Sequence, residues 1–278
     1  MRVDPTVKEI REALRSARNS DQVIGLVPTM GALHSGHEKL IQTARQECGI
    51  VVVSIFVNPL QFGPQEDYSR YPRPFGRDLE VCQREGVDMV FAPFVDEMYP
   101  ETQLAFTEVM RVSEGLCGAF RPGHFRGVAT VVLKLFNIVQ PDRAYFGEKD
   151  MQQLAVIRRM VKDLNVPVEI VPVATVREAD GLAVSSRNQY LDAEQRRVAP
   201  VVFRALQEAE RWIRAGEKDA VKIRAAATQI LKEAPVRVEY FEVVDPEDMQ
   251  PVATITGPVR VAAAVWLGTT RLIDNVLV

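Results

Sequence analysis

Short apolar runs alternate with helical patterns through the first 175 or so residues, and this alternation constrains the fold most strongly. Residues 50–57 form a nearly continuous β-branched run, which is typical of a strand covered on both faces. Further strands are predicted at 23–27, 88–92, 144–146 and 168–173, and helices at 37–48, 77–85, 128–139 and 154–164. Alternation at these lengths predicts βαβ units, so we expect an α/β fold with a Rossmann-like parallel sheet.

The pattern changes after about residue 175. A long helix is predicted at 198–213 and a second one at 221–231, then strands at 236–244 and 259–267, with the chain ending on 275–278. Helices followed by strands indicate an α+β arrangement. We therefore expect residues 1–175 to form a Rossmann-like domain and residues 176–278 a smaller α+β domain.

Composition excludes several classes of protein. The 34 Lys and Arg residues against 37 Asp and Glu give a net charge of −3, which disfavours a general nucleic-acid binder. The first 20 residues predict an amphipathic helix of the folded domain, and the longest apolar run is far shorter than the ~18–20 residues that span a bilayer. Three distant cysteines without C-x-x-C spacing indicate neither a disulfide framework nor a cysteine zinc site. We expect a soluble, cytoplasmic protein with no nucleic-acid or membrane partner.

The segment 27–37, VPTMGALHSGH, passes from a strand through a glycine-containing turn into a helix. Neither a P-loop nor G-x-G-x-x-G occurs in the chain, and Ile41 breaks H-E-x-x-H. Gly31 and Gly36 allow close approach to a phosphate, which the unpaired N–H groups of a helix start favour. His34 and His37, two of only three histidines, are three residues apart and are predicted on one side of the helix start. A helix-capping pair and a pair of metal ligands are the alternatives.

Three other segments carry groups suited to anions. Residues 147–150, GEKD, follow a short strand, although an Asp in this position is also a common helix cap. Residues 185–188, SSRN, combine hydroxyls with Arg at the predicted domain junction, although Ser-rich loops are frequent. Residues 121–127, RPGHFRG, contain the third histidine, His124, and are equally consistent with a surface turn. Neutral amides near strand ends could bind a small polar substrate: Asn58, Gln61, Gln152 and Gln153.

The residues of these segments resemble a known family. PTMGALHSGH is similar to the HIGH-type signature of the nucleotidylyltransferase superfamily, in the form found in the pantothenate synthetase (pantoate–β-alanine ligase) family. The similarity continues through VSIFVNPLQFGPQEDYSRYPR, GHFRGVATVV, FGEKDMQQL, VREADGLAVSSRN and VEYFEVVDPE, in the family's order over nearly the whole chain. Small departures are Val184, where Leu or Met often precedes Ser-Ser-Arg, and Pro74, where Thr is usual.

The resemblance implies an activity and a set of small-molecule partners. The reaction would be ATP-dependent ligation of (R)-pantoate and β-alanine to pantothenate through a pantoyl-adenylate, releasing AMP and diphosphate, in coenzyme A biosynthesis. Mg²⁺ would bind mainly through the ATP phosphates, with no metal ligand assigned to the protein. The resemblance further implies a homodimer in which the C-terminal domain acts as a lid over an N-terminal domain that binds ATP and pantoate.

The resemblance also assigns roles to residues of this sequence. His37 matches the catalytic histidine, with His34 and Lys149 beside it. Gln61 and Gln153 match pantoate-binding glutamines, Asn58 the β-alanine site and Arg121 a phosphate-side arginine, while His124 receives no role. The implied ATP-binding residues are Met30, Gly31, Ala32, Leu33, His34, Ser35, Gly36, His37, Gly147, Glu148, Lys149, Asp150, Val176, Val184, Ser185, Ser186 and Arg187.

Three alternatives to this ligase differ in their chemistry. A nucleotidylyltransferase would keep the nucleotide in its product and would not release AMP. A class I aminoacyl-tRNA synthetase is disfavoured because the chain is short and lacks a basic anticodon-binding extension. A catalytically inactive ATP-sensing module would not need to keep both histidines and Lys149, so their presence disfavours this alternative.

Overall fold

The computed structural model describes residues 1–64 and 66–278. The chain divides into two compact units: the first comprises 1–109, 121–148 and 156–174, and the second 110–120, 149–155 and 175–278. Residues 110–120 and 149–155 cluster with the second unit, whereas the sequence boundary at 175 placed them in the first. The side chain of Gln152 explains part of this difference, because it hydrogen-bonds the backbone around residues 112–117.

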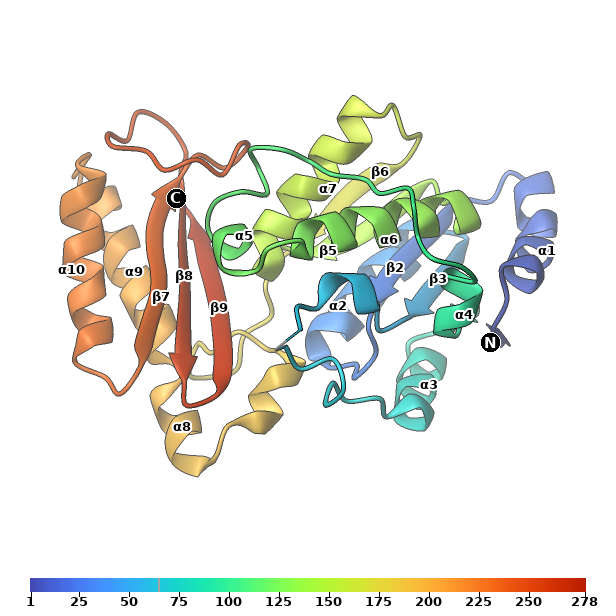
Figure 1. The fold of residues 1–278 in the computed structure, drawn as a ribbon, viewed down its shortest axis with the longest axis horizontal. Coiled ribbons are helices and arrows are strands. Elements are labelled where there is room, and N and C mark those ends of the chain that lie inside the picture. The colour runs from blue at the N-terminus through green and yellow to red at the C-terminus, as the bar shows by residue number, and fades with distance from the viewer. Residues whose placement is uncertain (65) are drawn as a thin grey trace. The chain divides into compact units, whose positions relative to one another are not determined.

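The first unit is built on a six-stranded sheet whose pairs are all parallel, as predicted (Figure 1). The strand order is β1-β4-β3-β2-β5-β6. The strands are β1 (Arg2–Asp4), β2 (Ile24–Thr29), β3 (Ile50–Ile55), β4 (Met89–Phe91), β5 (Arg143–Gly147) and β6 (Glu169–Val173). The edge strand β1 escaped prediction because three residues are too few to show a period.

Helices cover both faces of this sheet, and alternation along β5 shows how. Tyr145 packs in the core formed with α2, while its neighbour Phe146 contacts Phe136 of α6 on the opposite face. The helical segments that begin in this unit are α1 (Val7–Asn19), α2 (Ser35–Glu47), η1 (Pro59–Gln61), α3 (Phe75–Arg84), α4 (Val95–Met98), α6 (His124–Val139) and η2 (Glu148–Asp150). Helix α7 (Met151–Asp163) starts in the second unit and ends in the first.

The second unit packs helices against one face of an antiparallel sheet with the order β7-β8-β9 (Figure 1). Its remaining elements are α5 (Cys117–Phe120), η3 (Ser186–Tyr190), α8 (Ala193–Val198), α9 (Val201–Arg214), α10 (Ala220–Lys232), β7 (Arg237–Val244), β8 (Arg260–Leu267) and β9 (Thr270–Leu277). Ile223, Leu206 and Val265 lie at the centre of its core. The predicted smaller α+β unit is confirmed.

Two details of the second unit correct the sequence prediction. The single helix predicted at 198–213 is wrong at its start: Val198 is the last residue of α8, Pro200 has no N–H to continue the hydrogen bonds of that helix, and α9 begins only at Val201. No strand was predicted after residue 267, but Gly268, with φ of +59°, turns the chain from β8 directly into the eight-residue β9.

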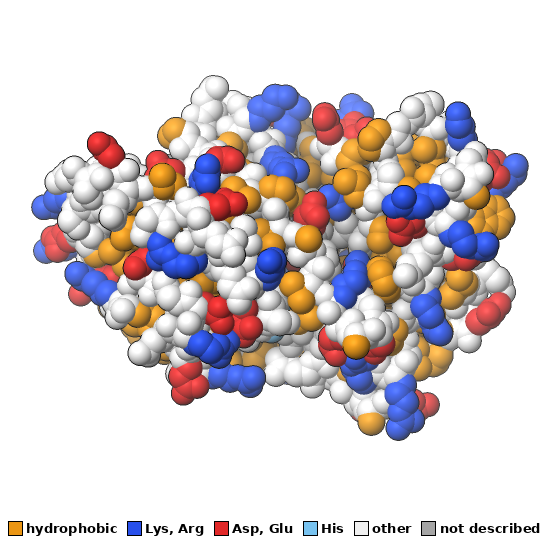
Figure 2. Space-filling view, turned by 180° about the vertical axis from the view of Figure 1, so that it is seen from behind, with side chains coloured by type: hydrophobic (Ala, Val, Ile, Leu, Met, Phe, Trp, Pro, Cys, Tyr) orange, Lys and Arg blue, Asp and Glu red, His pale blue; other side chains and the backbone are white. Residues whose placement is uncertain are grey.

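Charges of both signs are interspersed over the face shown in Figure 2, as expected from the nearly neutral composition. Within residues 1–64 and 66–278, no helix combines the length and the apolar character that a membrane span requires.

Candidate active site

The loop between β2 and α2 is anchored by buried polar groups. The hydroxyl of Thr29 donates to the carbonyl of Ser54 at 2.7 Å and accepts the N–H of Gly31 at 3.1 Å. Gly31 has a φ of +79° and Ala32 a φ of +50°, so the chain passes through two left-handed residues before the helix. The loop is therefore fixed before it reaches the histidines.

Asp78, which was not among the residues predicted from the sequence, is a second anchor of this loop. Its carboxylate, on α3 and only 1% exposed, accepts the N–H groups of Ala32 at 2.9 Å and Leu33 at 2.8 Å. A Cβ on Gly31 would lie 2.9 Å from the Asp78 carboxylate, so this glycine allows the close approach. Burial raises the pKa of Asp78, and the two N–H groups oppose that rise. The available signal was an acid on the buried face of a helix, beside Val81.

His34 and His37 cap the start of α2. His34 is the N-cap residue: its Nδ1 accepts the N–H of Gly36 at 3.1 Å, and Nδ1 of His37 accepts the N–H of His34 at 3.3 Å. The rings face each other with centroids 4.1 Å apart. Because each Nδ1 is an acceptor, these hydrogen bonds assign the proton of a neutral ring to Nε2. The two histidines therefore form the predicted helix-capping pair. Capping does not prevent a role in anion binding, because it uses the Nδ1 atoms and makes each Nε2–H a donor at a helix N-terminus.

Gln61 connects this loop to a buried amide, Asn58. The Nε2 of Gln61 donates to the sulfur of Met30 at 2.9 Å, and its Oε1 accepts from Asn58 at 3.2 Å. Asn58 is 1% exposed, and its other contacts are the carbonyl of Gly127, the N–H of Leu60 and the hydroxyl of Tyr99. These contacts use both donors and both acceptor positions of the Asn58 amide. The structure therefore makes Asn58 a support for Gln61.

Arg121, three residues before α6, and His124, the first residue of α6, secure the same segment. The Arg121 guanidinium binds both carboxylate oxygens of Glu66, at 2.7 and 2.5 Å. The Nδ1 of His124 donates to the carbonyl of Gln61 at 2.7 Å, and its Nε2 faces the Arg121 guanidinium at 3.0 Å. Burial raises the pKa of Glu66, but Arg121 outweighs it and leaves that pKa below its usual value. His124, to which the family resemblance assigns no role, thus supports the backbone of Gln61.

Apart from Gly147 and Glu148, the remaining candidates lie in two segments of the second unit. Lys149 has a side chain only 19% exposed and an ammonium 3.9 Å from the carboxylate of Asp150, which is half exposed. Gln153 is partly buried on α7. Gln152, a predicted substrate amide, instead uses its oxygen and both N–H donors on the backbone of Cys117, Val112 and Gly115.

The segment 176–187 folds back on itself. The N–H of Val184 donates to the carbonyl of Val176 at 3.0 Å, which brings two predicted ATP-binding residues side by side. Gly181, with φ of +90°, forms the tip; a Cβ there would lie 2.3 Å from the ring of Phe203. Ser185 then caps η3 by accepting the N–H of Arg187 at 3.3 Å.

The candidates therefore fall into two groups. The first unit contains Met30–His37, Asn58, Gln61, Arg121, Gly147 and Glu148, and the second contains Lys149, Asp150, Gln153, Val176 and Val184–Arg187. Among the described residues, no cluster of three or more His, Cys, Asp or Glu side chains is arranged to hold a metal ion. A parallel sheet with donors at a helix start is the arrangement typical of the nucleotide-binding class of α/β enzymes.

Comparison with known proteins narrows this class to one family. A family model described as pantoate-beta-alanine ligase matches residues 2–277. The pantothenate synthetase of Moorella thermoacetica is 54% identical over 273 residues, covering 98% of this chain and 96% of its own. The pantothenate synthetase crystal structure from Thermus thermophilus has a TM-score of 0.95, with 49% identity and 99% coverage of both chains.

A third relative was solved with ligands. The pantoate-beta-alanine ligase of Francisella tularensis, complexed with Beta-gamma ATP and Beta-alanine, is 34% identical with a TM-score of 0.81 and covers 100% of this chain and 97% of its own. The chain belongs to the pantoate-β-alanine ligase family, which confirms the predicted family. It is a ligase of pantothenate biosynthesis.

Proposed function

We propose that the protein condenses (R)-pantoate with β-alanine in two steps, through a pantoyl-adenylate, and releases AMP and diphosphate. The observation that carries this proposal is the pair of histidines at the start of α2, whose Nδ1 atoms are used in capping, so that Nε2–H becomes the donor toward an anion. Adenylation is needed because a carboxylate and an amine do not condense in water without a better leaving group.

In the first step, a carboxylate oxygen of pantoate attacks the α-phosphorus of ATP, and the bond to the diphosphate oxygen breaks. Negative charge grows on the oxygens of the α-phosphate. Nε2–H of His34, Nε2–H of His37 and the ammonium of Lys149 are the donors proposed to stabilise that charge. Gln61 and Gln153 are proposed to hold pantoate, with Asn58 and His124 fixing Gln61.

In the second step, the neutral amine of β-alanine attacks the acyl carbon of the adenylate. The bond between that carbon and the AMP oxygen breaks, the amine loses a proton and the amide of pantothenate forms. Water competes with the amine for the same carbon, so a site that excludes water protects the intermediate. We propose that residues 176–278 serve as that lid over an ATP- and pantoate-binding domain of residues 1–175.

The remaining ATP contacts, the cation and the assembly are also proposals. Both units carry implied ATP-binding residues, including Gly147 and Glu148 in the first and Asp150, Val176 and Val184–Arg187 in the second. Arg121 is proposed on the phosphate side. Mg²⁺ supplies charge neutralisation when bound, and we propose that the phosphates hold it, because it readily keeps phosphate and water ligands. A homodimer in a reducing cytoplasm is proposed, and the three free cysteines support that location.

Product analysis tests this function. The purified protein with ATP, Mg²⁺, pantoate and β-alanine should form pantothenate and AMP in equal amounts, and omission of either acid should stop pantothenate formation. A stable nucleotidylated product without AMP release would contradict the proposal.

A further inference from the structure

Two adjacent polar residues on the last strand, Asp274 and Asn275, are each only 5% exposed. Buried polar side chains are normally satisfied by partners, so the partners of these two show what the strand holds. All of the contacts described below lie within the second unit. Neither residue belongs to the set that the family resemblance assigns to the site.

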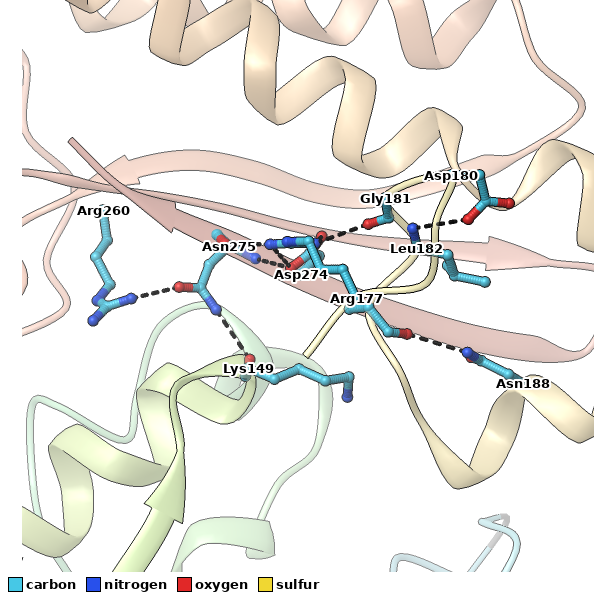
Figure 3. Close-up of polar contacts among 10 residues, drawn as sticks. Lys149, Arg177, Asp180, Gly181, Leu182, Asn188, Arg260, Asp274 and Asn275 are labelled. Carbon is cyan, nitrogen blue, oxygen red and sulfur yellow. Dashed lines mark hydrogen bonds and ion pairs between the residues drawn. The ribbon is translucent and has the colours of Figure 1, made fainter. Parts of the chain in front are cut away.

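Asn275 connects the sheet to the backbone of Lys149 (Figure 3). Its Oδ1 accepts from the Arg260 guanidinium at 2.6 Å, and its Nδ2 donates to the carbonyl of Lys149 at 3.0 Å. A guanidinium can only donate and a carbonyl can only accept, so the orientation of the amide is fixed. Figure 3 shows the Lys149 side chain extending away from Arg260, with its backbone held at Asn275.

Asp274 holds a second segment through Arg177. The guanidinium binds both carboxylate oxygens, at 2.5 and 3.0 Å, and donates to the carbonyl of Gly181 at 3.1 Å. The guanidinium also lies 3.9 Å from the ring centroid of Phe203. Arg177 stands one residue after Val176, in the turn that leads to Ser185–Arg187.

The ion pair in this network contributes little to the stability of the sheet. The Arg177 and Asp274 side chains are 20% and 4% exposed, and an ion pair removed from water to this extent contributes weakly to stability. Its distinguishing property is geometry, because a bidentate guanidinium–carboxylate pair fixes direction as well as distance. One strand thus sets the position of Lys149 and of the turn from Val176 to Arg187.

We infer that Asp274 and Asn275 are positioning residues for adenylation: Asn275 places Lys149 through its backbone carbonyl, and Asp274 places the 176–187 segment through Arg177. The inference rests on the proposed function, in which Lys149 and this segment contact ATP. Neither residue needs to touch a substrate.

The test for Asn275 is a double-mutant cycle with Lys149, read out as pantoate-dependent exchange of labelled diphosphate into ATP. Asn275→Asp keeps the size and the Arg260 contact but removes the donor to Lys149. We expect it to slow exchange about tenfold or more in the wild-type background, because small displacements of a reacting group are costly. In a Lys149→Ala background, the same change should alter the residual rate by less than about twofold, since the side chain it positions is gone.

Controls separate positioning from loss of stability. Leu272→Val, a core position on the same strand, should lower the melting temperature without changing exchange by more than about twofold. If Asn275→Asp does not fold, Asn275→Ala replaces it, because alanine introduces no buried charge. Asp274→Asn, which removes the charge at constant size, should raise the KM for ATP at least about fivefold and change kcat less.

Several results would overturn the inference. Three results would show that Asn275 acts only structurally. The first is an exchange rate in folded Asn275→Asp equal to that of the wild type. The others are that Asn275→Asp slows exchange by the same factor in the wild-type and in the Lys149→Ala background, or that Leu272→Val slows exchange as much as Asn275→Asp does. An unchanged KM for ATP in Asp274→Asn would remove the role of Asp274. Lys149→Ala at the wild-type rate would instead refute the proposed role of Lys149, and absence of exchange in the native protein would refute the proposed adenylation itself.

Discussion

The substitution Gly127→Ala, which adds one methyl group, perturbs the packing of α6 against the segment that carries Gln61. Gly127 lies on α6, and a Cβ added there would lie 2.2 Å from the carbonyl oxygen of Leu60 and 2.7 Å from Cα of Gln61. Those atoms belong to backbone, so they cannot rotate away. The helix or η1 must move about 1.2 Å to restore an ordinary contact of 3.4 Å, and this movement pulls the Gly127 carbonyl from Asn58.

The cost of Gly127→Ala follows from opposing terms. Overpacking costs about 3 kcal/mol and the lost hydrogen bond about 1 kcal/mol, while the helix propensity of alanine returns about 1 kcal/mol. We expect the free energy of unfolding in urea to fall by about 3 kcal/mol. Because the displaced segment carries Gln61, the KM for pantoate should rise while the KM for β-alanine changes less.

Gly76→Ala is the matched control for this prediction. Gly76 is also helical, on α3, and a Cβ there has nothing within 4 Å. It should leave activity unchanged and stabilise the fold by up to about 1 kcal/mol. If Gly127→Ala were as stable and as active as Gly76→Ala, the close approach of α6 to η1 would not support the site as argued.

Three further perturbations address the loop and its supports. His37→Ala should slow adenylation by about 10²-fold or more with the fold retained. His37→Gln can restore the helix cap, so it should recover the free energy of unfolding but not the rate of adenylation. A wild-type rate of diphosphate exchange in His37→Ala would contradict the role of His37. Asp78→Asn replaces one carboxylate acceptor by a donor facing an N–H group, and it should lower kcat/KM for ATP about tenfold or more; an unchanged value in steady-state assays would show that the anchor is dispensable. Because the folded-state pKa of Glu66 lies below its ordinary value of 4.5, its pairing with Arg121 stabilises the fold above pH 4.5 and is lost as the pH falls through the lowered pKa. The excess unfolding free energy of wild type over Glu66→Gln should therefore be present at about pH 6 and decline below pH 4.5, and a difference unchanged at about pH 3.5 would contradict this.

The features that the sequence predicted are those that depend on neighbouring residues. Periodicity locates the strands and helices of the first unit because the faces of an element repeat every 2 or 3.6 residues. The helix start at His34 was visible for the same reason, since glycine, histidine and the helix cap lie within a few positions of one another.

The supports of the site were not predictable in this way, because they depend on tertiary contacts between distant residues. Asp78 is 45 residues from Leu33, Arg121 is 55 from Glu66, and Asn275 is 126 from Lys149. The sequence singled out Arg121 for a phosphate but gave no indication of its pairing with Glu66, and neither Asp78 nor Asn275 was singled out at all. Asn58 shows the complementary limit: its type suited a substrate contact, but only the structure shows that its amide is fully used inside the protein.

Exchange of labelled diphosphate into ATP tests the central claim most directly. The native protein is incubated with ATP, Mg²⁺, pantoate and labelled diphosphate, and β-alanine is left out. A separate adenylation step at the start of α2 predicts that label enters ATP in the presence of pantoate and not in its absence. Exchange that appears only when β-alanine is added would contradict a free-standing pantoyl-adenylate and the two-step mechanism built on it.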